Sequence, residues 1–312
     1  MKQTDEKNFL QAFSDHFSQG SMTTAIAIRL SQAFPPSLGY PAGKLIATVL
    51  TNRFYSPLVK AVRLNQWMIH DRKITRRELN RAVYQVFAHQ ARSLYNFYRN
   101  LDTPEQVQKL VRVHPSMQRM MDSANQPGGR GTMMLIPHMS GFDLGGLLLA
   151  RQGFRYLTLS YPNPPHGYEW QNQLRNDRGE EVMPMSFQST QLARERLQAG
   201  GTVLTGVDRP YPGTGYFPTF FGEKAEMPVA YIKLAIKTKA RVFVVGFMTR
   251  PDMTYEIEAS DEIEMQPDAD PRRELESNAS RVLGACETFI RRNPAGWAMF
   301  YPVWPQLTAQ PS

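Results

Sequence analysis

Short apolar runs alternate with helix-like segments over the second part of the chain, and this alternation constrains the fold more than any other feature. Apolar runs of this length, bounded by Gly or Pro, are typical of strands buried on both faces of a sheet. The runs cover 132–136, 156–160, 202–207, 241–248 and 255–259, and helices are expected at 142–151, 188–199, 227–237 and 272–292. The alternation predicts an α/β fold in which helices flank a central, mostly parallel sheet.

The first part of the chain, residues 1–125, lacks such runs and has a helical pattern. Turn-forming residues at 126–131 (QPGGRG) separate it from the segment that follows. A chain of 312 residues can form one domain, so we expect a single domain with a helical N-terminal region (1–125) and an α/β core (130–305). Apolar residues at helical spacing predict helices within 26–34, 45–54, 75–100 and 104–113.

The charge balance favours an anionic partner. Lys and Arg number 36 against 28 Asp and Glu, which gives a net charge of +8. Such a surface suits anionic lipid headgroups, CoA phosphates, an acidic carrier protein or nucleic acid. The cations are spread along the chain and form no concentrated basic stripe, which argues against nucleic acid. The single cysteine, Cys286, excludes an internal disulfide and fits a reducing compartment.

No targeting or membrane-spanning segment is evident in the sequence. Residues 1–17 mix charges with apolar side chains, and no run reaches the roughly 18 apolar residues of a transmembrane helix. We therefore expect a cytoplasmic chain, peripheral on the inner face of the cell membrane. The expected helices within 26–54 place cations such as Arg29 and Lys44 beside apolar residues. They either pack on the body of the protein or form an amphipathic platform on a lipid surface.

One strand–turn–helix unit carries residues suited to chemistry. The apolar run 132–136 ends at Pro137, and His138 follows it, at the strand end where open α/β sheets place their ligands. Asp143 lies five residues later, after a turn that Gly141 permits. This spacing predicts that the Asp143 carboxylate reaches one imidazole nitrogen of His138 and leaves the other as a base. The alternative is that Asp143 caps the helix and His138 is an ordinary loop histidine.

Other catalytic signatures are missing from the sequence. It has no Gly-x-Ser-x-Gly elbow, no phosphate-binding P-loop and no dinucleotide glycine fingerprint. Its six histidines show no paired-ligand spacing, so no metal site is expected. A serine hydrolase, a nucleotide-binding enzyme and a zinc enzyme are therefore disfavoured.

The segment 138–143 (HMSGFD) resembles the His-x4-Asp/Glu box of the glycerolipid and lysophospholipid acyltransferases. It is most similar to the branch that contains the lipid A late acyltransferases and the phosphatidylinositol mannoside acyltransferases. Lys239 stands where that branch has a glycine. Further elements that resemble the branch follow in order over about 60–305: 62–65 (VRLN), Asn163-Pro164, Arg175, Arg178-Gly179, 206–209 (GVDR), 217–223 (FPTFFGE), 235–242, and Trp297 with Trp304.

The resemblance implies transfer of a fatty acyl group from an acyl thioester to a hydroxyl of a membrane lipid or glycolipid. Acyl-CoA or acyl carrier protein would be the co-substrate, and no cofactor is expected. The catalytic residues would be His138, as general base, and Asp143, which holds it. Arg175 and Arg178 would bind phosphate or stabilise charge, Asp208 would order the acceptor, and Glu223 would make a second contact to His138. The residues expected to bind substrate are Arg175, Arg178, Asp208, Arg209 and Glu223.

Two other functions remain open at this point. A hydrolase would use the same His138–Asp143 pair to activate water on an ester, because transfer and hydrolysis differ in whether the site admits water. A non-catalytic lipid-binding or nucleic-acid-binding module would rely on the positive charge alone.

Overall fold

The computed structural model describes residues 20–126, 128–162 and 166–307. The N-terminal segment 1–17 and the Asn163-Pro164 element lie outside these residues. Among the helices in the described ranges, none combines the length and the apolar character needed to cross a bilayer.

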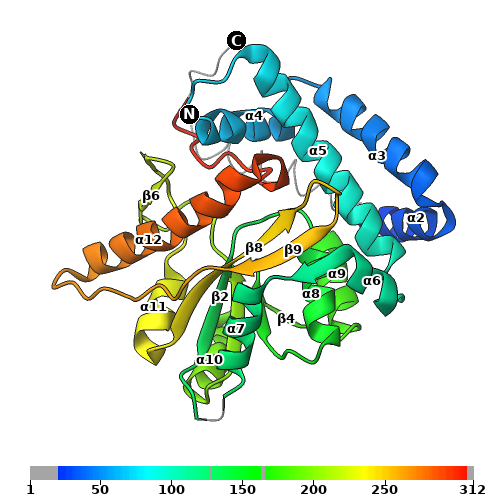
Figure 1. Cartoon of the computed structure of the whole chain (residues 1–312). Helices are drawn as coiled ribbons and strands as arrows, with labels where there is room; N and C mark the ends of the chain where they lie inside the picture. Colours follow the sequence, from blue (N-terminus) through cyan, green and yellow to red (C-terminus); the bar gives the residue numbers. More distant parts are fainter. Residues whose placement is uncertain (1–19, 127, 163–165, 308–312) are drawn as a thin grey trace.

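A seven-stranded sheet forms the centre of the molecule, with strand order β1-β9-β8-β2-β5-β3-β4 (Figure 1). Every neighbouring pair is parallel except β8 and β9, which are antiparallel. The predicted α/β fold with a mostly parallel sheet is therefore confirmed. The strands are β1 Val111–Val113, β2 Thr132–Ile136, β3 Leu157–Ser160, β4 Glu181–Pro184, β5 Thr202–Gly206, β8 Arg241–Thr249 and β9 Tyr255–Ala259, and a separate hairpin pairs β6 Thr219–Phe220 with β7 Glu223–Lys224.

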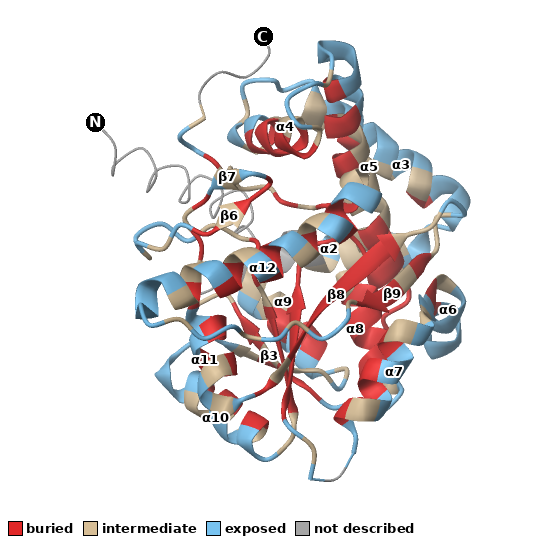
Figure 2. Cartoon of the chain, turned by 60° about the vertical axis from the view of Figure 1, so that its left-hand side comes forward, coloured by how far each residue is buried: buried red, intermediate tan, exposed pale blue. Residues whose placement is uncertain are grey.

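Helices cover both faces of this sheet. Gly145 of α8 lies against Phe247, and Gly246, which points to the opposite face, lies against Phe289 of α12. The strands between them are buried, whereas the outer sides of the helices are exposed (Figure 2). The helices of this part are α7 Pro115–Ala124, α8 Phe142–Arg151, α9 His166–Asn176, α10 Phe187–Gln198, α11 Ala230–Thr238, α12 Pro271–Arg292 and the short η1 Pro294–Gly296.

The N-terminal region is helical, as predicted, and is joined to the far end of the chain. Asn65 of α4 donates hydrogen bonds to the carbonyl oxygens of Met299 and Tyr301 and accepts one from the amide of Val303. This contact gives the Asn of the 62–65 element a structural role, because it holds the C-terminal segment against the helices. The helices are α2 Gly20–Ala33, α3 Pro36–Thr51, α4 Pro57–Ile69, α5 Arg76–Arg99 and α6 Pro104–Leu110.

Several elements differ from the predictions. The helix expected over 104–113 ends at Leu110, and its last three residues form β1, which pairs with β9. The β-branched Val111 and Val113 favour a strand once a partner is available. Neither α9 nor β4 was predicted. Lys239 ends α11 with a φ of 52°, in the left-handed region, which explains a glycine at this position in the resembling branch.

Candidate active site

His138 is held by Asp208, which follows the neighbouring strand. Asp208 Oδ1 lies 2.5 Å from His138 Nδ1, and Asp208 Oδ2 accepts a hydrogen bond of 2.9 Å from the backbone amide of His138. Ile136 and Gly206 are paired in the parallel β2–β5 ladder, so the residues two positions beyond each strand end meet. Because a carboxylate only accepts hydrogen bonds, this contact places a proton on Nδ1 and leaves Nε2 free to act as a base.

The predicted pairing of His138 with Asp143 is wrong. Asp143 Oδ1 accepts hydrogen bonds from Arg175 Nε at 3.0 Å and from Arg175 Nη2 at 2.7 Å. Gly141, with a φ of 95°, turns the chain so that Asp143 enters the first turn of α8 and faces α9. His138 and Asp143 lie only five residues apart, but Arg175 of α9 is a stronger partner for the Asp143 carboxylate.

The Asp208 carboxylate is fully buried and well supplied with donors. Trp297 Nε1 donates a hydrogen bond of 2.6 Å to Oδ2, in addition to the two donors of His138. The Asp208 side chain has an exposed fraction of 0%. A buried carboxylate is costly unless hydrogen bonds replace its water, and these three bonds do so while they fix its orientation toward His138.

The C-terminal segment fixes the backbone of the His138 loop. The Ser140 amide donates to the carbonyl of Gly296 at 2.6 Å, and the Ala298 amide donates to the carbonyl of His138 at 2.8 Å. Met139 and Trp297 form an antiparallel bridge between these bonds. The Trp297 motif therefore serves the site in two ways, because its backbone holds the loop and its indole holds Asp208.

The end of β5 provides the space in which the imidazole lies. A Cβ atom at Gly206 would come within 2.7 Å of His138 Cε1, so only a glycine leaves room for the ring. The His138 side chain remains 30% exposed. The segment 206–209 thus contributes three features to the site. Gly206 leaves space for the imidazole, Asp208 is its hydrogen-bond partner, and Arg209 is a cation.

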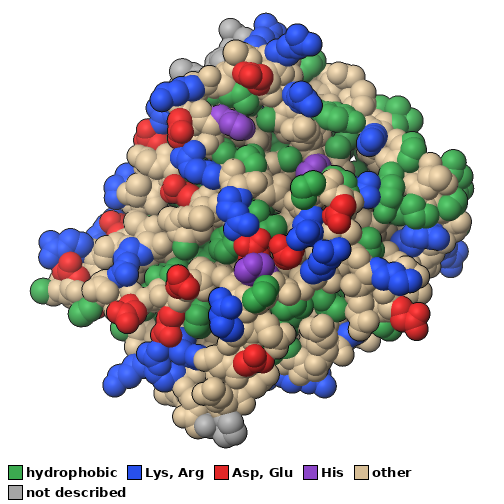
Figure 3. Space-filling view, viewed as in Figure 1, with side chains coloured by type: hydrophobic (Ala, Val, Ile, Leu, Met, Phe, Trp, Pro, Cys, Tyr) green, Lys and Arg blue, Asp and Glu red, His purple; other side chains and the backbone are tan. Residues whose placement is uncertain are grey.

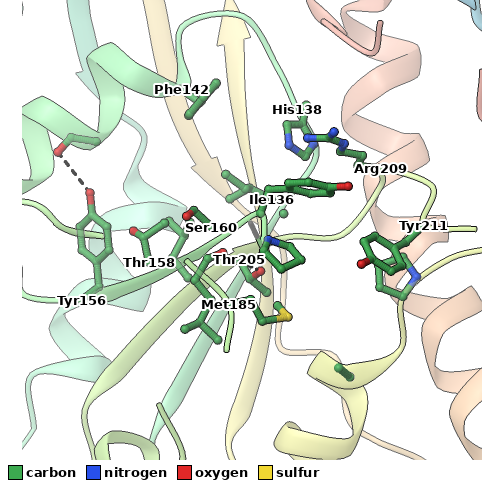
Figure 4. Close-up of a pocket in the computed structure, with 18 of the residues that line it drawn as sticks. Ile136, His138, Phe142, Tyr156, Thr158, Ser160, Met185, Thr205, Arg209 and Tyr211 are labelled. Carbon is green, nitrogen blue, oxygen red and sulfur yellow. Dashed lines mark hydrogen bonds between the residues drawn. The ribbon is translucent and has the colours of Figure 1, made fainter. Parts of the chain in front are cut away.

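A cavity of about 450 Å³ extends from His138 between α8 and the sheet (Figure 4). This volume falls in the range of small-molecule sites. Its walls are mainly apolar and aromatic, with Phe142, Leu149 and Phe247 on the side of α8. An apolar channel that begins at a base suits an acyl chain whose reactive end lies at the imidazole.

Two of the predicted substrate-binding residues lie at His138: Asp208, expected to order the acceptor, instead holds the imidazole, and Arg209 lies beside the ring. The guanidinium carbon of Arg209 lies 3.9 Å from the ring centroids of both Tyr161 and Tyr301. Figure 4 shows Arg209 beside His138 at the cavity wall. Stacking between two rings holds the guanidinium in one orientation and contributes cation–π attraction. The site therefore combines a base with a positioned positive charge.

Three other predicted residues have different surroundings. Arg175 lines the cavity, but it is buried and its charge is paired with Asp143. Arg178 bonds to Asp102 at 3.1 Å, and Glu223 forms an ion pair with Arg72, so the expected second contact of Glu223 to His138 is not observed. Neither Arg178 nor Glu223 lines the cavity described above. Their predicted substrate contacts therefore have no support from this geometry.

The single cysteine is a core residue. Cys286 lies on the buried side of α12, and burial, with nearby Asp208 and Glu287, raises the pKa of its thiol well above the ordinary value. A thiol in this state is a poor nucleophile.

Comparison with known proteins places the chain in a family. A family model for the bacterial lipid A biosynthesis acyltransferases matches residues 16–306. The chain belongs to this family. It is 26% identical over 180 residues to a phosphatidylinositol mannoside acyltransferase of Mycolicibacterium smegmatis, covering 56% of this chain and 57% of the relative. It is 30% identical over 116 residues to a protein of the same name from Mycobacterium tuberculosis, covering 36% of this chain and 37% of the relative.

In this member of the lipid A biosynthesis acyltransferase family, the Asp143–Arg175 pair should stabilise the fold. Both side chains are nearly buried, with exposed fractions of 11% and 6%. Arg175→Ala leaves the Asp143 charge buried without its partner, so we expect it to lower the free energy of unfolding by about 3–5 kcal/mol. Chemical denaturation measures this change.

Arg178→Ala is the matched control for that variant. It removes an arginine from the same segment, but its partner Asp102 is 69% exposed, so we expect a loss of less than about 1 kcal/mol. Equal losses for the two variants would contradict the structural role of the buried pair.

Proposed function

We propose that this protein is an O-acyltransferase that moves a fatty acyl group from an acyl thioester to a hydroxyl of a membrane lipid or glycolipid. The observation that carries the proposal is the His138 imidazole, held at Nδ1 by Asp208 and placed at an apolar cavity. Membership of the family supports acyl transfer, and the names of the two mycobacterial relatives support a glycolipid acceptor.

The geometry suggests how the transfer proceeds. His138 Nε2 takes the proton of the acceptor hydroxyl while the hydroxyl oxygen attacks the thioester carbonyl carbon. The resulting tetrahedral intermediate expels the thiolate as the C–S bond breaks, and the thiolate takes the proton from Nε2. The products are an acyl ester and a free thiol, with His138 returned to its starting state. A thioester is already activated, so the sequence of steps needs no covalent intermediate on the protein.

Arg209 is the group suited to stabilise the charge that develops. A tetrahedral intermediate carries negative charge on the former carbonyl oxygen, and a positioned cation or hydrogen-bond donor lowers its free energy. Arg209 lies beside His138, and its guanidinium is oriented by Tyr161 and Tyr301. Arg175, which we expected in this role, is paired with Asp143 instead.

An acyl-transfer assay tests the proposal. The purified protein is mixed with radiolabelled palmitoyl-CoA, or with palmitoyl acyl carrier protein, and with detergent-dispersed phosphatidylinositol mannosides and lysophospholipids. We expect a labelled acyl ester of at least one acceptor. Labelled fatty acid without ester would instead establish a hydrolase, and lipid binding without either product would establish a non-catalytic module.

We further propose that α2 and α3 rest on an anionic membrane surface at the inner face of the cell membrane. One side of α3 packs on α5, where Ala47 is buried and Gly39 lies against Tyr95. Large apolar residues are exposed on the outer side of α2 and α3 and just after each helix (Figure 3). We call these residues the apolar platform. Its members are Ile26, Leu30, Phe34, Leu38, Leu45, Ile46, Val49, Phe54 and Tyr55.

The charges around the apolar platform favour anionic lipid as its partner. Residues 20–70 contain five Lys or Arg and no Asp or Glu. Arg29 and Lys44 lie on the helices themselves, and Arg53 and Lys60 follow them. Apolar side chains that enter the acyl boundary, with cations at the headgroups, form the pattern of an interfacial helix.

Vesicle flotation tests the membrane proposal. We expect binding to phosphatidylcholine vesicles only when they contain phosphatidylglycerol, and we expect Leu45→Ser with Ile46→Ser to weaken it on the order of tenfold for each residue. Phe187→Ser is the matched control, because Phe187 is 83% exposed but lies on α10. Binding that ignores lipid charge, or that falls equally in the control, would overturn the proposal.

A further inference from the structure

The cavity extends beyond the part that lies between α8 and the sheet. Its wall also includes Tyr211, Tyr216 and, on α11, Lys233. We call the part that these three residues line the second arm. α11 packs against α12, which covers the face of the sheet opposite α8. Figure 4 shows Tyr211 and Tyr156 on opposite sides of the cavity. The proposed transfer, as described so far, gives the second arm no role.

The loop that forms one wall of the second arm is fixed by hydrogen bonds. Oε1 of Glu226 accepts hydrogen bonds from the amides of Gly213 and Gly215, at 3.0 and 2.8 Å. Oγ1 of Thr214 donates to the carbonyl of Met227 at 3.1 Å. These three bonds tie the loop to the residues that lead into α11, so the wall has a defined shape before a ligand enters.

Lys233 is a cation at the mouth of the second arm. It is exposed and lines the cavity, and its Nζ lies 5.2 Å from the ring centroid of Tyr216. Within the described part of the chain, no carboxylate forms an ion pair with it. Arg175 and Arg209 also line the cavity, but Arg175 is paired with Asp143 and Arg209 is stacked between two tyrosine rings. Lys233 is therefore available to the negative charge of a ligand.

The protein surface around this mouth is basic. Residues 228–251 contain Lys and Arg but no Asp or Glu. Lys237 follows Lys233 one turn later on α11, and both are exposed. Glu276 lies beside the loop, but Arg272 pairs with it at 3.2 Å. Such a surface attracts a ligand that carries negative charge.

The second arm lies away from the proposed membrane surface. Figure 1 shows α11 on the side of the molecule opposite α2 and α3, which carry the apolar platform. The lipid acceptor of the proposed transfer comes from the membrane, so the arm beside α11 suits the water-soluble substrate. That substrate is the thioester donor. In CoA and in acyl carrier protein alike, the sulfur belongs to a phosphopantetheine group, which ends in a phosphate.

From this arrangement we propose that the second arm binds the phosphopantetheine group of the thioester donor, with its phosphate at Lys233. The inference rests on the proposed acyl transfer and adds a binding site for the donor. The acyl chain then lies between α8 and the sheet, with the thioester at His138. The pantetheine chain lies along Tyr211 and Tyr216. The ammonium group of Lys233 donates a charge-assisted hydrogen bond to the phosphate.

Two donors that differ only in the phosphate test the inference. Palmitoyl-phosphopantetheine and palmitoyl-pantetheine share the acyl chain, the thioester and the pantetheine chain. We expect kcat/KM to be about tenfold higher for the phosphorylated donor, because a hydrogen bond between charged groups stabilises the bound donor. The gain should lie in KM, because the phosphate is remote from the reacting carbon and contributes equally to the ground state and the transition state.

One variant and a matched control assign this preference to Lys233. Lys233→Met removes the charge and keeps much of the side-chain length, so the two donors should have about the same kcat/KM. Only the phosphorylated donor should become slower. Lys237→Met is the control, because Lys237 lies on the same helix and is exposed but does not line the cavity. It should leave the preference unchanged.

The two natural sources of this group are compared in the same assay. Palmitoyl-CoA and palmitoyl acyl carrier protein both contain phosphopantetheine, so Lys233→Met should raise KM for both about tenfold. The larger kcat/KM of the two in the wild type identifies the source of the acyl group.

Binding of unreactive thioethers keeps this test separate from that of the transfer itself. Calorimetric titration compares the hexadecyl thioether of phosphopantetheine with that of pantetheine. If no thioester yields an ester but the phosphorylated thioether binds more tightly to the wild type and not to Lys233→Met, the proposed function fails and the phosphate site stands. Equal binding and equal kcat/KM with and without the phosphate would overturn the inference. A preference that is unchanged in Lys233→Met, or lost in Lys237→Met, would do the same.

Discussion

Replacing His138 with alanine should lower kcat for acyl transfer on the order of 10³-fold. In the proposed transfer, Nε2 of His138 is the base, because Asp208 holds the opposite ring nitrogen. Without it, the acceptor hydroxyl must lose its proton to water, while the thioester can still enter the cavity. KM for the thioester should therefore change little, and the loss should lie in kcat. Initial rates of ester formation at saturating thioester measure the effect.

A second histidine variant controls for general effects of the substitution. His70 ends α4 and does not line the cavity, so His70→Ala should retain nearly the full rate. A His138→Ala enzyme that keeps more than about a tenth of the wild-type kcat would show that general-base catalysis by this residue is dispensable.

We expect Asp208→Asn to lower kcat by about 10²–10³-fold with the fold retained. The amide keeps the shape of the carboxylate, but its nitrogen cannot accept the proton that His138 Nδ1 carries. The ring then loses the orientation and the proton position that make Nε2 the base, an effect well known for buried carboxylates behind a catalytic histidine. With the amide nitrogen toward His138 Nδ1, the amide oxygen still accepts the hydrogen bonds from Trp297 and the His138 amide, which is why we expect the fold to be retained.

Asp143→Asn distinguishes the role of the Asp143 carboxylate from that of Asp208. Asp143 is paired with Arg175, so its amide variant should lower the free energy of unfolding and, below its melting temperature, keep most of kcat. If Asp143→Asn lost as much kcat as Asp208→Asn while its stability was unchanged, the assignment of Asp208 as the partner of His138 would be wrong.

The position of His138 could be predicted from the sequence, whereas its partner could not. The run 132–136 marks β2, and a strand end in an open α/β sheet is where ligands bind. The partner depends on the order of strands, because Asp208 meets His138 only if β5 is the neighbour of β2. One signal was present, because the run 202–207 is also followed directly by a polar residue, Asp208. The short spacing between His138 and Asp143 favoured Asp143 as the partner. Spacing of this kind carries no information about contacts between residues 70 positions apart.

The other differences also arise from contacts between distant segments. The short strands β1 and β4 lie at the two edges of the sheet, where each gains its pairing from a single neighbour. Their sequences carry little pattern of their own, so only the completed sheet defines them. Arg175 and Asp143 are likewise 32 residues apart, and a buried ion pair leaves no periodic mark in the sequence.

The imidazole nitrogen chemical shifts of His138 test most directly the claim that Asp208 leaves Nε2 free as the base. They are recorded at about pH 8, where an ordinary imidazole is neutral, in the wild type and in Asp208→Asn. We predict a proton on Nδ1 and none on Nε2 in the wild type, and a changed tautomer balance in the variant. A proton on Nε2 in the wild type, or identical spectra for the two proteins, would contradict the account.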